Sequence, residues 1–459
     1  MATLAEPQPR FTHWSQKLPK DALAHIPGES GIPVFGTTLS LVADPVGYGK
    51  RMHATYGPVF RSRPFGVNQV TLIGPEANEL LLFDRDKVFS SEQGWGPALD
   101  QLFPRGLMLI DFEAHRVDRK ALGIAFKPGP MRHYADALNR GIAAGVAQWG
   151  GGPMLFYPAI KQLTLDLAAD SFLGIPWGPE AQKVNQAFVD LVNASIGIVR
   201  KPWPGTAMGR GVAGRNYLVE MFTAETLKRR ETGGGQDMFS QFANATREDG
   251  SLLDVSQVVD HMIFLMLAAH DTITSAASSL LYYLLKHPEW QAKLRAEAMA
   301  VSGGTGTVAY DDLPRMELTE MAFKEALRLI PPVPALPRRA LRDFTFKGHR
   351  IPAGTQVGIS IQMAHRLADI WPDPARFDPL RFTPAEIAKR HKYAWAPFGG
   401  GAHMCVGLHF AYMQIKILIA QLLTRYELVL EEGYDPPWAP WPIPKPKDGM
   451  RMTFRPLAD

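Results

Sequence analysis

The stretch that decides the fold of this chain is Phe398-Gly399-Gly400-Gly401-Ala402-His403-Met404-Cys405-Val406-Gly407. Three glycines in a row allow backbone conformations closed to other residues and let a flat ligand approach closely. The only cysteine of the sequence follows, and the apolar pattern after it predicts a helix over residues 407–426. Cys405 thus stands at a helix amino terminus, where the dipole and free amide groups favour a thiolate. Such a thiolate can ligate haem iron and donate electron density to it.

A lone cysteine has two other interpretations. Free cysteine is among the most buried residue types, so Cys405 by itself is compatible with a purely structural role. A nucleophilic cysteine enzyme is the second alternative, but no histidine stands in a comparable motif to act as its base. The glycine loop favours the iron ligand over both.

The composition is that of an ordinary globular protein. Apolar residues make up 46% of the 459 residues and charged residues 20%. A net charge of +4 is too small to indicate nucleic acid binding, and we expect none. Length alone favours about three domains, but no stretch has the composition of a linker. We expect an N-terminal extension over residues 1–25 and a single catalytic domain over residues 26–459.

The chain shows no sign of export or membrane anchoring. Its N-terminus lacks the apolar core of a signal peptide. Its most apolar segment is interrupted by His270, Asp271 and Thr272, which favours a buried helix over a membrane span. A single cysteine excludes an internal disulfide framework. We therefore expect a cytoplasmic monomer.

Helical periodicity dominates the chain. Helices are predicted near residues 46–56 and over 112–126, 181–195, 216–230, 255–286, 288–301, 318–329 and 407–426. Strand patterns occur over 59–64, 68–73, 344–348 and 356–361. The expected architecture is mainly α, with a small strand-rich lobe near residues 58–74 and 335–362.

Ala268-Ala269-His270-Asp271-Thr272 lies in the middle of the long apolar helix. Burying a charge without a partner is expensive, so an acid here needs a reason. A satisfied core hydrogen-bond cluster is one explanation, and it is the one that we adopt for His270 alone. For the pair of Asp271 and Thr272 we favour a functional role.

Glu325 and Arg328 share one face of a predicted helix, a pair worth only about 0.2–0.5 kcal/mol on an exposed surface. The segment Phe377-Asp378-Pro379-Leu380-Arg381-Phe382 follows them. Together with the earlier motifs, and with His115 and Arg119 four residues apart, this order resembles the cytochrome P450 family across essentially the whole chain. The cysteine loop is similar to the family's ligand signature at every fixed position. Residues 338–426 resemble its sterol-demethylase-type branch, which often has His where Asp271 stands, so sterol demethylation is not assigned.

The resemblance implies the P450 fold, with haem b (iron protoporphyrin IX) held by the Cys405 thiolate between a long distal helix and the cysteine loop. It implies that Asp271 and Thr272 deliver protons to bound dioxygen, with Ala269 in place of the usual glycine. Glu325, Arg328 and Arg381 would form a structural triad. The implied cofactor-binding residues are Cys405, His115, Arg119, Arg338, His403, Phe398, Gly407 and Ala268, with Arg339 a rival of Arg338. The implied pocket residues are Trp95, Phe103, Ile198, Leu265, Ala269, Val333 and Leu336.

The expected activity is a monooxygenase that inserts one oxygen atom from O2 into a C–H bond of an apolar terpenoid, steroid or fatty acyl compound. Electrons would come from a separate ferredoxin and its reductase, because no fused redox domain is present. Basic residues that could dock the ferredoxin are Arg116, Lys120, Arg390 and Lys392. A peroxide-driven peroxygenase and a non-catalytic haem sensor are the alternatives, and neither needs the pair of Asp271 and Thr272.

Overall fold

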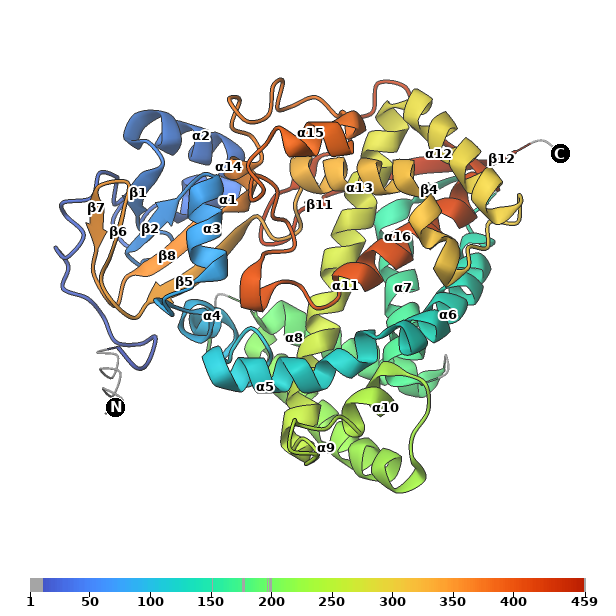
Figure 1. Ribbon diagram of the computed structural model, residues 1–459, viewed down its shortest axis with the longest axis horizontal. Helices are drawn as coiled ribbons and strands as arrows, with labels where there is room; N and C mark the ends of the chain where they lie inside the picture. Colours follow the sequence, from blue (N-terminus) through green and yellow to red (C-terminus); the bar gives the residue numbers. More distant parts are fainter. Residues whose placement is uncertain (1–10, 151, 176–177, 196, 198–199, 458–459) are drawn as a thin grey trace.

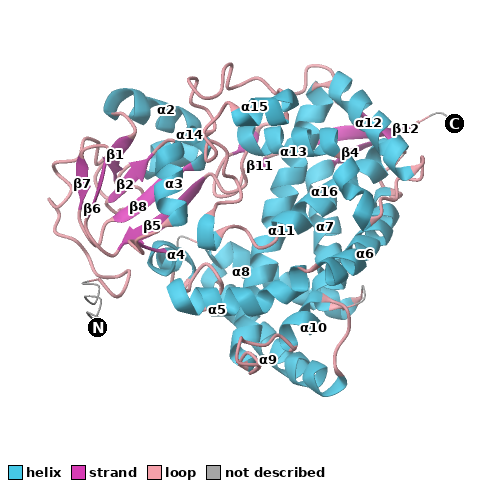
Figure 2. Cartoon of the chain, in the orientation of Figure 1, coloured by secondary structure: helices cyan, strands magenta, loops and turns pink. Residues whose placement is uncertain are grey.

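The structure is a computed structural model and describes residues 11–150, 152–175, 178–195, 197 and 200–457. Helices make up most of it, and strands gather in a smaller lobe on the side where the chain begins (Figures 1 and 2). The predicted mainly α fold with a small β lobe is confirmed. The helices are α1 (Thr38–Ala43), α2 (Pro45–Tyr56), α3 (Pro75–Phe83), α4 (Ser91–Leu99), α5 (Phe112–Leu122), α6 (Pro128–Val146), α7 (Phe156–Ala168), α8 (Pro179–Ser195), α9 (Ala207–Thr232), α10 (Met238–Ala243), α11 (Val255–Lys286), α12 (Pro288–Ser302), α13 (Glu317–Leu329), α14 (Ile361–Ala364), α15 (Pro384–Ala388) and α16 (Leu408–Leu423).

The β lobe is built on a five-stranded sheet of order β1-β2-β8-β5-β3. Strands β2 and β8 run parallel, and the other neighbours pair antiparallel. Alternate residues such as Val70, Leu72, Val357 and Ile359 are buried, as the period of a strand requires. The strands are β1 (Val59–Ser62), β2 (Gln69–Leu72), β3 (Phe89–Ser90), β4 (Pro153–Leu155), β5 (Ala335–Ala340), β6 (Phe344–Phe346), β7 (His349–Ile351), β8 (Gln356–Ser360), β9 (Tyr426–Val429), β10 (Trp438–Ala439), β11 (Lys445–Pro446) and β12 (Arg451–Pro456).

Helix α11 runs through the middle of the helical lobe (Figure 1) and is buried along most of its length. It begins with a capping box, in which Asp254 and Gln257 satisfy each other's backbone amides. Helix α11 and the segment Gly401–Leu423 are long and apolar enough to cross a membrane, but 78% and 67% of their most apolar windows are buried inside the protein.

Two predicted helix boundaries are wrong. The helix expected over 216–230 is the second half of α9, whose first turns contain Gly209, Gly211 and Gly214. Glycine is a poor helix former, which hid these turns. The glycines let α8 approach: a Cβ on Gly211 would lie 2.3 Å from that of Ala194. The helix expected over 112–126 ends at Leu122 and continues as a 3-10 helix over Gly123–Phe126.

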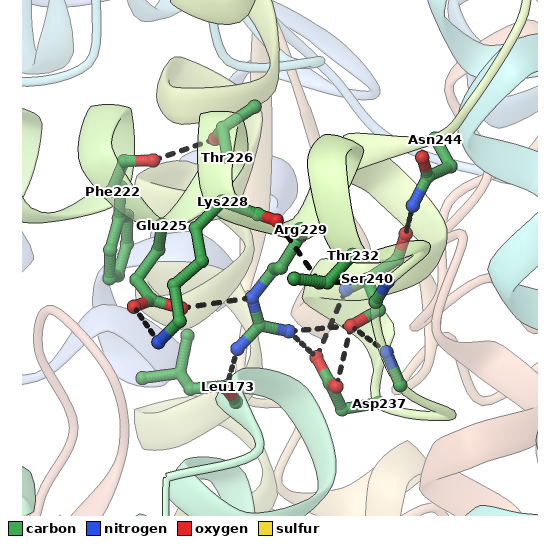
Figure 3. Close-up of polar contacts among 12 residues, drawn as sticks. Leu173, Phe222, Glu225, Thr226, Lys228, Arg229, Thr232, Asp237, Ser240 and Asn244 are labelled. Atoms are coloured by element: carbon green, nitrogen blue, oxygen red, sulfur yellow. Dashed lines mark hydrogen bonds and ion pairs between the residues drawn. The ribbon is translucent and has the colours of Figure 1, made fainter.

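The carboxyl end of α9 is fixed by Arg229. Its guanidinium donates to the carbonyl of Leu173 at 2.6 Å and to Ser240 Oγ at 2.7 Å, and it pairs with Asp237 (Figure 3). Glu225, one turn earlier on α9, lies 3.3 Å from its Nε. Arg229 thus ties α9 to α10 and to the segment after α7.

Candidate active site

The cysteine loop is held in a shape that depends on glycine. Gly401 has φ +60, and a Cβ on it would lie 2.0 Å from the carbonyl oxygen of Leu82 in α3. The amide of Cys405 donates to the carbonyl of Phe398 at 2.9 Å, which closes the loop. Gly407 forms the N-cap of α16. The loop therefore presents Cys405 at the amino end of α16, as predicted from the sequence.

Cys405 is deep in the fold and yet accessible. Burial raises the pKa of its thiol, although the Gly407 amide and the Arg119 charge oppose that effect. The residue nevertheless keeps accessible surface. A metal bound to the sulfur would deprotonate the thiol outright.

Helix α11 has one accessible strip in its middle. Ala268 is exposed and Asp271 and Thr272 are half-buried, whereas residues 261–266 and 273–281 are buried. Residues 268, 271 and 272 share one helix face. The Thr272 hydroxyl donates to the carbonyl of Ala268 at 2.7 Å, which leaves its oxygen free to accept from another donor.

Asp271 has two basic neighbours. Its Oδ1 lies 3.2 Å from Nδ1 of His270 and 3.4 Å from Nζ of Lys161, which comes from α7. Burial would raise the pKa of Asp271, but His270 and Lys161 outweigh it and hold the pKa at about 2. Asp271 is therefore ionised at neutral pH. Nothing in the sequence pointed to Lys161, which is 110 positions away in the chain.

Four basic side chains, His115, Arg119, Arg338 and His403, meet beside Cys405; we call them the cation cluster. The rings of His115 and His403 lie 3.9 Å apart. Burial, then the charges of Arg119 and Arg338, lower the pKa of His115 to about 4. Burial, followed by His115 and Arg338, lowers the pKa of His403 to about 2. The structure thus brings these four sequence-predicted residues together, and their role stays a prediction.

The structure separates Arg338 from its rival Arg339. Both are on β5, where successive side chains point to opposite faces. Arg338 interacts with Asp84 and Asp111 and lies close enough to His115 and His403 to lower their pKa values. Arg339 donates instead to the carbonyls of Gly354 and His13. Arg338 is therefore the arginine of the cation cluster.

Haem fits these residues. His115 Nε2 is buried without a hydrogen-bond partner within the described part of the chain. Burial lowers the pKa of both Arg119 and Arg338. An orphaned ring nitrogen, a half-buried arginine and a buried arginine suit the two carboxylates of haem. The soft thiol of Cys405 suits its iron.

Glu325, Arg328 and Arg381 lie together in the core. Arg328 holds Glu325 with two hydrogen bonds of 2.7 and 2.8 Å, and both side chains have 0% exposure. Arg381 Nε lies 3.4 Å from Glu325 Oε1. Arg328 also donates to the carbonyls of His365, Pro374 and Arg376. The three residues tie α13 to the chain that leads to the cysteine loop.

The predicted pocket residues are scattered over two apolar clusters. Phe103 and Leu265 are buried in the main core, and Trp95 and Ala269 pack against it. Leu336 packs against the core of the β lobe, and Val333 is half-buried. Ile198 lies outside the described residues. The pocket role of these residues stays a prediction.

Sequence reasoning missed a buried link between α5 and α11. Asp118, one turn after His115, accepts from His261 Nε2 at 2.9 Å and from Gln257 at 3.3 Å. Asp118 is 3% exposed and His261 2%. The link joins the helix of the cation cluster to the helix of Asp271. The spacing of Asp118 from His115 is the only local signal, and it does not name the partner.

Comparisons with known proteins agree with this geometry. A family model described as Cytochrome P450 matches residues 26–452. The chain is 36% identical to putative cytochrome P450 136 of Mycobacterium tuberculosis over 95% of this chain and 90% of that protein. It is 29% identical to putative cytochrome P450 120 of Synechocystis, over 94% and 97%. It is similar to a solved cyanobacterial enzyme with bound retinoic acid, with 28% identity and a TM-score of 0.85 over 94% and 99% of the two chains.

Proposed function

Because the chain belongs to the cytochrome P450 family, and is therefore a haem-containing monooxygenase, we propose that it inserts one oxygen atom from O2 into a C–H bond of an apolar, lipid-like molecule. We propose Cys405 as the axial ligand. The observation that carries the proposal is the cation cluster beside Cys405, with its two arginines and the orphaned His115 Nε2. When bound, haem supplies the iron at which dioxygen is reduced.

The cation cluster would hold the haem carboxylates. Arg119 and Arg338 would supply the charge, and His115 the free Nε2. His403 would contribute through its stacking on His115. Because these groups are already buried, the cluster is organised before the cofactor arrives, which lowers the entropy that binding costs.

The strip on α11 would deliver protons. Asp271 stays ionised at neutral pH and is a poor proton source by itself. Its role would be to accept a proton from His270, Lys161 or water and pass it on. The Thr272 hydroxyl donates its hydrogen to the carbonyl of Ala268. Its oxygen would therefore accept a hydrogen bond from a donor and orient that donor at the reacting oxygen. Proton delivery would therefore need both Asp271 and Thr272.

The proposed substrate class is terpenoid, steroid or fatty acyl. Phe264 and Leu265, one turn before Ala268 on α11, are apolar and buried. The solved relative binds retinoic acid, an isoprenoid carboxylic acid. An apolar wall with few polar groups selects such molecules mainly by shape and burial.

Electrons would come from a ferredoxin and its reductase in the cytoplasm, with the enzyme acting as a monomer. Of the predicted docking residues, Arg116 and Lys120 share Glu248, at 3.0 Å and 2.5 Å, which neutralises part of their charge. Arg390 lies over Trp371 and Lys392 over Tyr393. Arg390 is half-buried and also donates to the carbonyl of Arg381, so the exposed Lys392 remains the stronger candidate to meet an acidic partner.

Optical spectroscopy tests the proposal. The reduced CO complex of the wild-type protein should show the band of a thiolate-ligated haem, and Cys405→Ala should lose it. A Cys405→Ala protein that kept the band would overturn the ligand assignment. A panel of retinoids, terpenoids, steroids and fatty acids should include compounds that shift ferric haem from low to high spin. Turnover with a ferredoxin system rather than with peroxide would separate the monooxygenase from the peroxygenase, and no turnover with either would indicate a sensor.

A further inference from the structure

Residues 11–16, which we call the N-terminal strap, are held against β5 by Arg339. The guanidinium donates to the carbonyls of His13, at 2.7 Å, and of Gln16. It also lies 5.0 Å from the centre of the Phe11 ring. Arg339 is 1% exposed and Phe11 7%. A nearly inaccessible arginine is thus used to bind main-chain carbonyls of the strap, which is a strong and directional attachment.

The strap also holds α4. Trp14 Nε1 donates to Asp100 Oδ2 at 3.1 Å, just beyond the end of α4. The Trp14 ring lies over Gly96, where an added Cβ would come within 2.4 Å of it. Gln93, on the first turn of α4, donates to the carbonyl of Phe11 at 3.2 Å. Contacts at the first turn, the middle and the end of α4 fix its position on the β lobe.

Helix α4 in turn contacts residues beside the cation cluster. A Cβ on Gly94 would lie 2.7 Å from Cα of Arg338, so the two backbones touch. At the amino end of α4, the amide of Ser91 donates to Asp111 at 2.8 Å, and the Ser90 hydroxyl does so too. Asp111 Oδ1 lies 3.9 Å from His403 Nε2. The path from strap to cluster is therefore continuous through packed groups.

We propose that the N-terminal strap is a positioning element for haem: it holds α4 and β5 so that Arg338 keeps its place in the cation cluster and Asp111 its place beside His403. This inference rests on the proposed haem site. Phe11, Trp14 and the rest of the strap precede residue 26, where the match to the family model begins. The strap therefore lies outside the part of the chain that the family model matches. Trp14 and Arg339 act through α4 and β5 and are positioning residues.

Haem transfer to excess apomyoglobin tests the proposal in the holoenzyme. We expect Trp14→Ala, and a deletion of residues 1–17, to release haem roughly tenfold faster than wild type, the size of effect seen when outer partners of ligand groups are lost. Trp14→Phe keeps a ring over Gly96 and loses only the bond to Asp100, so its rate should lie between. The matched control is a deletion of residues 1–10, which keeps the contacts of Phe11, His13, Trp14 and Gln16 named above and should release haem at the wild-type rate.

Resonance Raman bands of the haem carboxylates provide a readout that general loss of stability does not move. They should shift in Trp14→Ala and in the 17-residue deletion and stay unchanged in the 10-residue deletion. Wild-type release rates and wild-type carboxylate bands in both strap variants would overturn the inference. So would faster release in the 10-residue deletion alone. The reduced CO spectrum of wild type is recorded first: absence of a thiolate-type band there contradicts the haem site itself, whereas a normal band with unaffected strap variants contradicts only the role of the strap.

Discussion

The rings of His115 and His403 lie 3.9 Å apart, so that α5 and the cysteine loop meet through two neutral imidazoles. Burial of both rings, followed by the neighbouring charges, lowers their pKa values, which keeps them unprotonated at neutral pH. The contact places an uncharged aromatic pair in the middle of a cationic region. That choice reduces the repulsion that four full charges would cause.

The haem-free protein should lose stability on acidification because of His115. The unfolded chain binds a proton at a pKa near 6.5, whereas folded His115 stays neutral down to about 4. Protons therefore favour the unfolded state between these values, at about 1.4 kcal/mol per pH unit for this one group. Urea unfolding at pH 7, 6, 5 and 4 measures the slope. His115→Gln should reduce the slope of the unfolding free energy against pH by about 1.4 kcal/mol per pH unit. An unchanged slope would contradict the lowered pKa of His115.

Replacing Asp271, the acid on α11, should lower turnover more than replacing Lys161, the base that faces it. Asp271→Asn should lower turnover of a substrate found by spin shift about a hundredfold, the usual scale for a positioned proton carrier. Lys161→Met should lower turnover less. It should also shift the pH dependence of turnover to higher pH, because Lys161 is one of the groups that hold the pKa of Asp271 down. Lys183→Met, an exposed lysine on α8, is the control. Equal activity in Asp271→Asn and wild type would exclude the proton role.

Thr272→Ala should redirect electrons from product formation to hydrogen peroxide rather than prevent their consumption. The variant should consume reducing equivalents at nearly the wild-type rate while more of them appear as hydrogen peroxide and fewer as product. Thr272→Ser keeps the hydroxyl that donates to Ala268 and should restore coupling. The measurement is the ratio of product to electrons consumed. If that ratio stayed unchanged in Thr272→Ala, the threonine would have no part in proton placement.

Glu325→Gln should destabilise the fold severely. It leaves Arg328 buried without its counter-charge, at a cost of about 3–5 kcal/mol. Urea unfolding of the holoprotein gives the loss. The control is Glu317→Gln on the same helix, which is exposed and should stay within about 0.5 kcal/mol of wild type. A small loss in Glu325→Gln would mean that the carbonyls of His365, Pro374 and Arg376 suffice to hold Arg328.

The buried pair of Asp118 and His261 should couple energetically. Asp118→Asn and His261→Gln are each expected to cost about 1–3 kcal/mol. Because the residues touch, the double variant should cost less than the sum, with a coupling of about 0.5–3 kcal/mol. Asp136→Asn, on the exposed face of α6, serves as control. Strict additivity would show that the hydrogen bond contributes little.

Sequence reasoning located features that depend on residues close together in the chain. The glycine run before Cys405 and the spacing of Glu325 from Arg328 follow from rules of backbone geometry and helix faces. The four members of the cation cluster came from resemblance, because their positions are far apart in the chain. Single-helix patterns also sufficed to locate α11 and α13.

The sequence did not predict which residues far apart in the chain pair with each other. Nor did it predict which of two adjacent residues faces the site. Asp118 and His261 are separated by 143 positions, and Lys161 and Asp271 by 110. Arg338 and Arg339 differ only in which face of β5 each occupies, and a one-residue slip of a strand reverses that choice. The strap of residues 11–16 carries no helix or strand pattern, so its contacts with Arg339 and α4 were visible only in three dimensions.

The order of the five-stranded sheet constrains how the protein is made. Strands β1, β2 and β3 leave the ribosome early, but their partners β5 and β8 follow only after residues 91–334. At about 5–20 residues per second, translation of that stretch takes roughly 12–50 s. During this time the hydrogen-bonding edge of β2 that later pairs with β8 has no partner, and unpaired edges template aggregation. A chain truncated before residue 335 lacks β5 and β8 and so cannot complete the five-stranded sheet.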